Sequence, residues 1–274
     1  MNRPQEGASA RPRALPRVLA LGILGGFLLL SIGLALAVGP GGPAWRLPGP
    51  ILTLRLLRLA LGVFAGGALA LTGAALQGML RNPLADPFTL GVSSGAAFGV
   101  TLASFLGLAS GVLSPLFGIA GAGLTALVLA GVIISFLLSS GVMLLVVLGR
   151  RTLGEAVYVL MGHLGFTFTG GSLWIFVPGA VLALAGCAAL VAFGRDLDIL
   201  STGEETASGL GVDVNRVTAL VFASTALIVG VVVAFTGAVS FVGLVVPHLA
   251  RFLVGPRHRR VMPVAFAIGA GMLL

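Results

Sequence analysis

Charged side chains are scarce in this sequence, and lysine is missing altogether. Charged residues make up 9% of the 274 positions, whereas a soluble globular domain carries about 25%. With 58% hydrophobic residues and a mean hydropathy of +1.14, the chain cannot cover a water-exposed surface with polar groups. We therefore predict an integral membrane protein. The net charge of +8 then indicates arginines gathered in cytoplasmic loops rather than nucleic-acid binding.

Cysteine and acidic residues are also rare, which argues against several kinds of site. The only cysteine, Cys187, lies in an apolar run, so a disulfide and a cysteine-rich metal site are excluded and we predict no metal. An ion-coupled transporter, the main alternative function, places ionisable groups at mid-membrane. An intramembrane enzyme is disfavoured because His163 and His248 have no carboxylate partners at ligand spacing. The acidic residues all fall in or beside predicted loops: Glu6, Asp86, Glu155, Asp196, Asp198, Glu204, Glu205 and Asp213.

Apolar segments of membrane-spanning length are abundant. A span needs about 20 apolar residues, so the chain has room for about eight or nine spans with short loops. We predict an all-α polytopic membrane protein with a basic, cytoplasmic N-terminal tail at 1–17 and a transmembrane domain at 18–274. The predicted spans cover about 18–38, 59–78, 90–108, 173–194 and 217–236, followed by a shorter helix at 239–254 and a helix with Pro263 in its first turn.

The uncharged stretch 113–149 is compatible with one span or with two short ones. One span would place Arg150 and Arg151 on the cytoplasmic side, as the positive-inside rule favours. Two spans instead place the polar segment 195–216 on that side, and we adopt this alternative. The chain stops at Leu274 within an apolar run, so we expect about eight and a half spans and a longer parent protein.

Two strings of residues are unusual for membrane helices. Residues 81–87 read RNPLADP, and each proline keeps the residue before it out of the helical region. We predict a compact connector, held at the water interface by Arg81 and Asp86. Residues 240–251 read SFVGLVVPHLAR, where Pro247 should interrupt the hydrogen-bond ladder of the helix. His248 is expected to pack or lie at the interface rather than bind a metal.

A resemblance to a known family rests on these strings and three others. The others are RLLR at 55–58, LMGHLGF at 160–166 and GEETASGLGVDVNR at 203–216, and RNPLADP extends to TGAALQGMLRNPLADPFTLGVSSGA at 72–96. Together they resemble the FecCD-type permease family, the membrane subunits of ATP-binding-cassette (ABC) importers for iron-siderophore, haem or cobalamin. The resemblance implies a helical permease of ten spans that works by alternating access. It also implies no catalytic residue here, with ATP and Mg bound by a separate ATPase, and the sequence has no P-loop.

The resemblance also assigns roles to residues. Arg55 and Arg58 match arginines that dock the substrate-binding protein, although Leu57 stands where the family usually has proline. We expect Thr202 to cap a short interfacial helix, which Gly209 and Gly211 end. The ATPase-coupling residues of that helix would be Gly203, Glu204, Glu205, Ala207, Leu210, Gly211 and Val212. The family-motif residues are Arg81, Asn82, Pro83, Leu84, Ala85, Asp86 and Pro87 in the connector, and Gly243, Pro247, His248 and Arg251 in the later helix.

The expected partners follow from the same resemblance. They are a second permease copy or a related permease, cytoplasmic P-loop ATPase subunits, a periplasmic or lipid-anchored substrate-binding protein, and membrane lipid. The expected location is the bacterial cytoplasmic (inner) membrane, with the N-terminus inside. Siderophore-bound iron dominates the family, and no residue here separates it from haem or cobalamin. The shortened 113–149 region and the end at Leu274 keep a second alternative open, a non-functional truncated permease.

Overall fold

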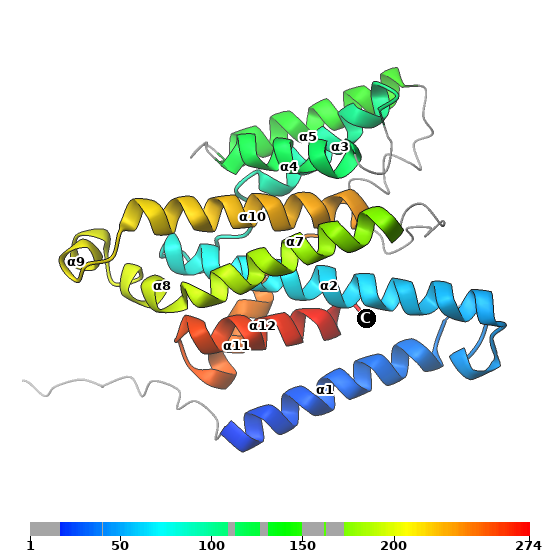
Figure 1. Cartoon of the computed structure of the whole chain (residues 1–274), viewed down its shortest axis with the longest axis horizontal. Coiled ribbons are helices and arrows are strands. Elements are labelled where there is room, and N and C mark those ends of the chain that lie inside the picture. The colour runs from blue at the N-terminus through cyan, green and yellow to red at the C-terminus, as the bar shows by residue number, and fades with distance from the viewer. Residues whose placement is uncertain (1–16, 40, 109–112, 127–130, 150–161, 163–172) are drawn as a thin grey trace, which may run out of the picture.

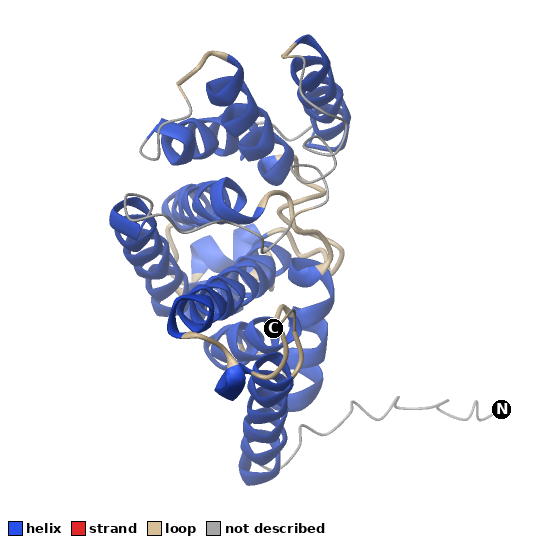
Figure 2. Ribbon diagram, turned by 90° about the vertical axis from the view of Figure 1, so that its right-hand side faces the viewer, coloured by secondary structure: helices blue, strands red, loops and turns tan. Residues whose placement is uncertain are grey.

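A computed structural model describes residues 17–39, 41–108, 113–126, 131–149, 162 and 173–274. Most of the N-terminal tail, Arg150, Arg151 and nearly all of the LMGHLGF string lie outside the described residues. Within the described ranges the chain forms only helices and loops, which confirms the predicted all-α fold (Figure 2).

Figure 1 shows the helices with their labels. They are α1 (Arg17–Ala37), α2 (Gly49–Met79), α3 (Val92–Phe105), α4 (Leu113–Ala126), α5 (Gly131–Leu148), α7 (Leu173–Ala192), α8 (Gly194–Leu200), α9 (Glu204–Gly209), α10 (Val214–Thr236), α11 (Val242–Val254) and α12 (His258–Met272), with a 3-10 helix η1 (Ala44–Arg46) before α2.

Two predicted helix starts are wrong. Helix α2 begins at Gly49, ten residues before the predicted span, because Arg55 and Arg58 lie within the helix instead of ending it. Pro50 occupies the first turn of α2, where its missing N–H costs nothing. Helix α12 begins at His258, so Pro263 lies inside it rather than in its first turn. The proline ring removes only the bond to the carbonyl of Arg259, close to the helix end.

Helix α2 is the centre of the bundle. Its second half is rich in alanine and glycine, and nearly every residue from Leu61 to Met79 is buried. Helices α7, α10, α11 and α12 pack around it. A Cβ added to Gly66 would fall on the carbonyl oxygen of Gly269 in α12, so the two backbones touch. Small residues allow this close approach, which supplies the packing energy that the hydrophobic effect cannot supply between helices in lipid.

The stretch 113–149 forms two helices, α4 and α5, as the alternative of two short spans requires; that each of them crosses the membrane stays a prediction. Glycines set the packing of α4 in the same way as that of α2. A Cβ at Gly121 would meet the carbonyl oxygen of Gly95 in α3, and one at Gly118 would lie 3.0 Å from the carbonyl oxygen of Gly230 in α10. Helix α4 is therefore held between α3 and α10 and is short, at 14 residues.

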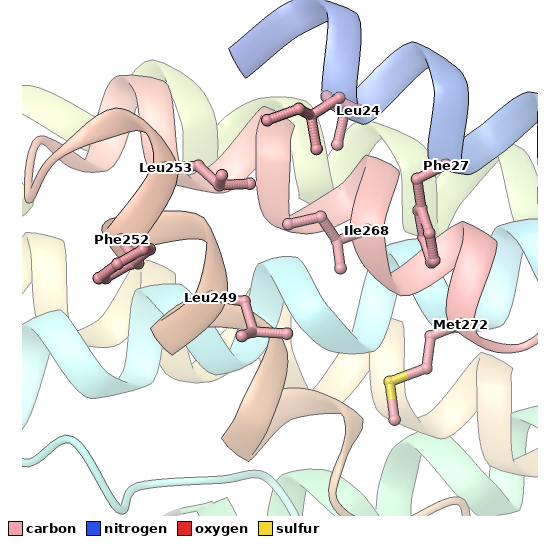
Figure 3. A pocket seen from close by; sticks show the side chains of 8 residues that line it. Leu24, Phe27, Leu249, Phe252, Leu253, Ile268 and Met272 are labelled. Carbon is pink, nitrogen blue, oxygen red and sulfur yellow. The ribbon is translucent and has the colours of Figure 1, made fainter. Parts of the chain in front are cut away.

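Helix α1 lies at the periphery and contacts α12 and α11. A pocket of about 420 Å³ separates these helices and is lined only by apolar side chains, as Figure 3 shows. Such walls fit hydrocarbon and offer no hydrogen bond to a polar ligand. The lining residues are Ile23, Leu24, Phe27, Leu249, Phe252, Leu253, Ile268 and Met272.

Among the described residues, two helices are long and apolar enough to cross a membrane, namely α2 and α10. A third crossing results if α7 and α8, which meet at a 53° bend, count as one span. Shorter apolar helices of 10–17 residues make up most of the remaining bundle. Several of the predicted spans are therefore realised as helices shorter than the roughly 20 residues of a full crossing.

Candidate functional site

The two unusual strings of the sequence meet in space, where the end of α2 packs on α11. Pro247 lies inside α11 and has no N–H, so the carbonyl oxygen of Gly243, four residues earlier, lacks its usual helical partner. Gln77 fills this gap, because its Nε2 donates to the carbonyl oxygens of Gly243 and Leu244, each at 3.2 Å. Pro247 thus interrupts the hydrogen-bond ladder of α11, as predicted, while the helix itself continues to Val254.

Gln77 also binds the far end of α11. Its Oε1 accepts a hydrogen bond of 2.5 Å from Nη1 of Arg251, one of the predicted motif residues. The Gln77 amide thus provides hydrogen bonds both to the carbonyl that Pro247 leaves unpaired and to the half-buried guanidinium of Arg251. Gln77 lies within the string at 72–96, and the sequence alone assigned it no role. A polar side chain in the alanine- and glycine-rich part of α2 was the signal that marked it.

The connector at 81–87 is non-helical, as predicted, but Asp86 is not at the water interface. Ala85, Asp86 and Pro87 are buried, while Arg81 is exposed. Oδ2 of Asp86 accepts a bond of 3.2 Å from the backbone N–H of Phe88. Oδ1 lies against Gly243, where a Cβ would collide with it. Burial raises the pKa of Asp86 to about 6, and the bond from Phe88 opposes this rise.

We expect Asp86→Asn to stabilise the protein at neutral pH. Raising the carboxyl pKa from 3.8 to about 6 costs the folded state about 3 kcal/mol, an order-of-magnitude figure. The cost is complete at a pH above about 6, the pKa of Asp86 in the folded protein. It shrinks as the pH falls and is absent at a pH below 3.8, the ordinary pKa of the carboxyl. The melting temperature in detergent should therefore rise by several degrees at pH 7.5 and match wild type near pH 4. Glu205→Gln, which removes an exposed charge, is the control; equal stability of Asp86→Asn and wild type at pH 7.5 would contradict the argument.

Helices α8 and α9 form a short, bent segment at one end of the bundle (Figure 1). Ala207 and Val212 are buried and anchor α9, and the Val212 N–H donates to the Ala207 carbonyl at 3.0 Å. Leu210 is 66% exposed although it is apolar. Glu204 and Glu205 occupy the first turn, where they complement the helix dipole. The segment therefore presents one apolar and two acidic side chains outward from a buried anchor.

Two details of α9 differ between prediction and structure. Thr202 does not cap the helix, since its hydroxyl donates to the carbonyl of Ile199 at 2.7 Å. Gly203 is the capping residue, at φ +131°, a conformation that favours glycine. The helix ends at Gly209, as predicted, and Gly211 just beyond it has a positive φ. Arg81 Nη2 lies 3.6 Å from Glu204 Oε1, and this exposed pair contributes little energy.

The predicted docking arginines lie at the opposite end of α2, near η1. The rise of an α-helix separates Arg55 from the last residue of α2 by about 35 Å. Nη1 of Arg55 donates to the carbonyls of Leu36 at 3.3 Å and Gly42 at 2.9 Å. Arg55 therefore ties the end of α1 and the following loop to α2, whereas Arg58 is exposed.

The structure brings most of the predicted residues together at the α9 end of the bundle. The connector and α11 meet around the last turns of α2, and Glu204 of α9 contacts the connector through Arg81, whereas Arg55 and Arg58 lie elsewhere. His248 is exposed, and the described residues contain no group of three side chains that could hold a metal. The acidic residues in the described ranges occupy helix ends and loops.

Comparisons with known proteins identify the same family that these strings resemble. The model of the FecCD transport family matches residues 48–129 and 120–274. The cobalamin import system permease protein BtuC of Halobacterium salinarum is 40% identical over 244 residues, which cover 81% of this chain and 64% of the relative. The Fe(3+)-citrate import system permease protein YfmD of Bacillus subtilis is 34% identical over 242 residues, covering 82% of this chain and 71% of the relative. The chain thus spans about two thirds of the length of these relatives.

One solved structure shares both fold and sequence with the chain. It is an inward-facing conformation of a transporter assigned to the metal-chelate type of ABC transporters. The TM-score is 0.80 at 30% identity, with 94% of this chain and 88% of the other covered. This agreement extends over the short helices as well as the long ones.

Proposed function

The chain belongs to the FecCD transport family, and on this premise we propose that it is the membrane-spanning permease subunit of an ABC importer. ATP would bind with Mg to separate ATPase subunits, since the sequence has no P-loop and no lysine to form one. The chain itself would carry no catalytic residue and no cofactor. Its work would be to open a pathway alternately to the two sides of the bacterial cytoplasmic membrane.

The observation that carries the proposal is the separation of the two predicted partner sites. The arginine pair lies in the first turns of α2, whereas Glu204 of the α9 segment contacts Arg81, just beyond the last residue of α2, and the helix rise separates Arg55 from that last residue by about 35 Å. A permease needs this arrangement, because the ATPase acts from the cytoplasm and the binding protein delivers substrate from outside. We assign the α9 end to the cytoplasmic side and the η1 end to the periplasmic side. A second permease copy or a related permease would complete the pathway.

For the substrate we propose iron bound to a siderophore-type chelator. Support comes from the relative named for Fe(3+)-citrate import and from the metal-chelate type of the matching structure. Cobalamin is the second candidate, because the relative named for cobalamin import shares 40% identity. Both are metal chelates too large and polar for the apolar pocket beside α1, so that pocket is no part of the proposed pathway.

The test is reconstitution of the chain with its cognate ATPase and binding protein in proteoliposomes. We expect ATP-dependent uptake of a radiolabelled ferric siderophore, abolished when ATP is omitted. Uptake of labelled cobalamin in place of the siderophore would favour the second candidate. ATP-independent uptake driven by a proton or sodium gradient would refute the proposal and support an ion-coupled transporter. Failure to transport any chelate with all subunits assembled would support a non-functional permease.

We expect Arg58→Glu to weaken docking of the binding protein. Arg58 is exposed, so its charge can steer a transient acidic partner, and reversing it should lower the affinity about tenfold at low salt. Binding is measured by surface plasmon resonance on the permease in nanodiscs. Arg55 is a poor choice for this test, since losing its bonds to Leu36 and Gly42 would disturb the fold. Arg46→Glu, in η1 at the same end, makes the same change of charge at a different position and is the control. Unchanged affinity of Arg58→Glu would show that Arg58 is not part of the docking site.

We expect a cysteine at position 202 to be labelled only from the cytoplasmic side. Thr202 is exposed beside α9, and Cys187, the single native cysteine, is buried and should react little. Intact cells and inverted vesicles are treated with a membrane-impermeant maleimide. Trp45→Cys, 71% exposed in η1, should show the opposite pattern. Labelling of Thr202→Cys in intact cells would show that the assigned orientation is inverted.

A further inference from the structure

Asp198 and His258 form a half-buried contact that none of the predicted roles uses. Asp198 lies in α8, six residues before the first residue of α9, and His258 is the first residue of α12. Oδ1 of Asp198 accepts two hydrogen bonds, from the backbone N–H of His258 at 2.8 Å and from its ring Nδ1 at 2.7 Å. The histidine side chain is 6% exposed and that of the aspartate 31%.

The first of these bonds supplies α12 with an N-terminal cap that its own N-cap residue does not provide. Arg257 is the N-cap residue of α12 and makes no side-chain capping bond. The first N–H groups of a helix have no partner within it, and a carboxylate at this position also complements the positive end of the helix dipole. Asp198 therefore caps α12 from a helix that lies 60 residues earlier in the chain.

The second bond fixes the imidazole ring against α2. In the neutral imidazole, a proton on Nδ1 that is donated to the carboxylate leaves Nε2 as an acceptor. Nε2 is buried, has no hydrogen-bond partner among the described residues, and points at Gly78, where a Cβ would collide with it. Only glycine at position 78 lets the ring occupy this place. The contact thus joins three helices, with Asp198 on α8, His258 on α12 and Gly78 on α2.

The position of this contact suggests a role in transmitting motion. Only Ser201, Thr202 and Gly203 separate α8 from α9, and Gly203 has a positive φ. The exposed contact between Arg81 and Glu204 adds little to the hold on α9, which is anchored by the buried Ala207 and Val212 and packs on α8 and α10. We propose that Asp198 and His258 are positioning residues that lock α8 to α12 and α2, so that a force on α9 moves the central helices instead of flexing the linker. This inference rests on the proposed function.

The functional test measures substrate molecules transported per ATP hydrolysed in the reconstituted importer. Asp198→Ala should lower this ratio about tenfold, the usual size of a lost coupling contact, while ATPase recovery and hydrolysis stay near wild type. Asp198→Asn should restore the ratio, because its amide oxygen can accept both bonds. Arg195→Ala, which removes an exposed charge from the same helix, is the control. A wild-type ratio for Asp198→Ala, or an Asn variant as poor as the Ala variant, would overturn the proposal.

Two further measurements separate this inference from folding and from the proposed function. His258→Gln keeps the backbone bond to Asp198 and loses the ring, so its transport ratio should fall even if Asp198→Ala does not assemble; a wild-type ratio refutes the lock. Amide exchange at the start of α12 in the isolated chain should be faster in Asp198→Ala than in Asp198→Asn. Equal exchange refutes the contact itself. If wild type shows no ATP-driven transport but the exchange difference is present, the proposed function fails and the contact stands.

Discussion

Gly73→Val is expected to prevent the chain from folding in the membrane. Gly73 lies in the buried part of α2, and a Cβ there would fall on the carbonyl oxygen and Cα of Gly243 in α11. The obstructing atoms belong to backbone, so no side-chain rotation relieves the collision. Separating the helices would also break the bonds from Gln77 to Gly243 and Leu244. Overpacking of this kind costs about 3 kcal/mol or more, a large part of the stability of a typical domain.

The experiment compares fluorescent fusions by size-exclusion chromatography after detergent extraction. Wild type should elute as one symmetric peak, and Gly73→Val should aggregate or be degraded. Gly25→Val is the matched control, since α1 is peripheral and a Cβ at Gly25 would meet nothing within 4 Å. Val also has a similar cost in helix propensity at both positions. A symmetric peak for Gly73→Val would show that α2 and α11 do not touch as described.

Much of the helical framework follows from the distribution of apolar and charged residues. Long apolar runs predicted α1, α7 and α10 closely, and the need to keep 195–216 on one side of the membrane predicted two helices in 113–149. The sequence did not reveal that α2 is central, because centrality depends on which glycines face one another. Arg55 also misled the prediction of the start of α2. An arginine in an apolar segment marks a boundary only if water solvates it, and Arg55 is instead bonded to backbone carbonyls.

The candidate site was predictable as a set of strings but not as a set of contacts. Pro247 was correctly singled out, but the residue that responds to it is Gln77, 170 positions away in the sequence. Gln77 donates a hydrogen bond to the Gly243 carbonyl, which the proline leaves without a helical partner. Asp86 was expected in water because it is charged and lies in a loop. Its burial follows from packing against Gly243, which a local pattern cannot show. The pairing of Asp198 with His258 is equally non-local.

Leu210→Asp is expected to abolish recovery of the ATPase with the permease. Leu210 is 66% exposed at the end of α9, and its backbone N–H already bonds to the carbonyls of Thr206 and Ala207. The side chain therefore contributes little to the fold, and its apolar surface is free for a partner. Burying a leucine in a groove contributes about 1.5–3 kcal/mol, and an aspartate in its place would add the cost of a desolvated charge. The affinity should fall at least about tenfold, enough to lose the partner during washing.

Pull-down of the cognate ATPase on an affinity-tagged permease measures this effect. The matched control is Asn215→Asp, which adds the same charge at an exposed position in the first turn of α10. Glu204→Ala should have a smaller effect, because Glu204 is highly exposed and its pairing with Arg81 is weak. If Leu210→Asp and wild type recover equal ATPase, then α9 is not where the ATPase binds. Loss in both Leu210→Asp and Asn215→Asp would instead assign the effect to negative charge near this end of the bundle, since only an apolar contact predicts a difference between the two.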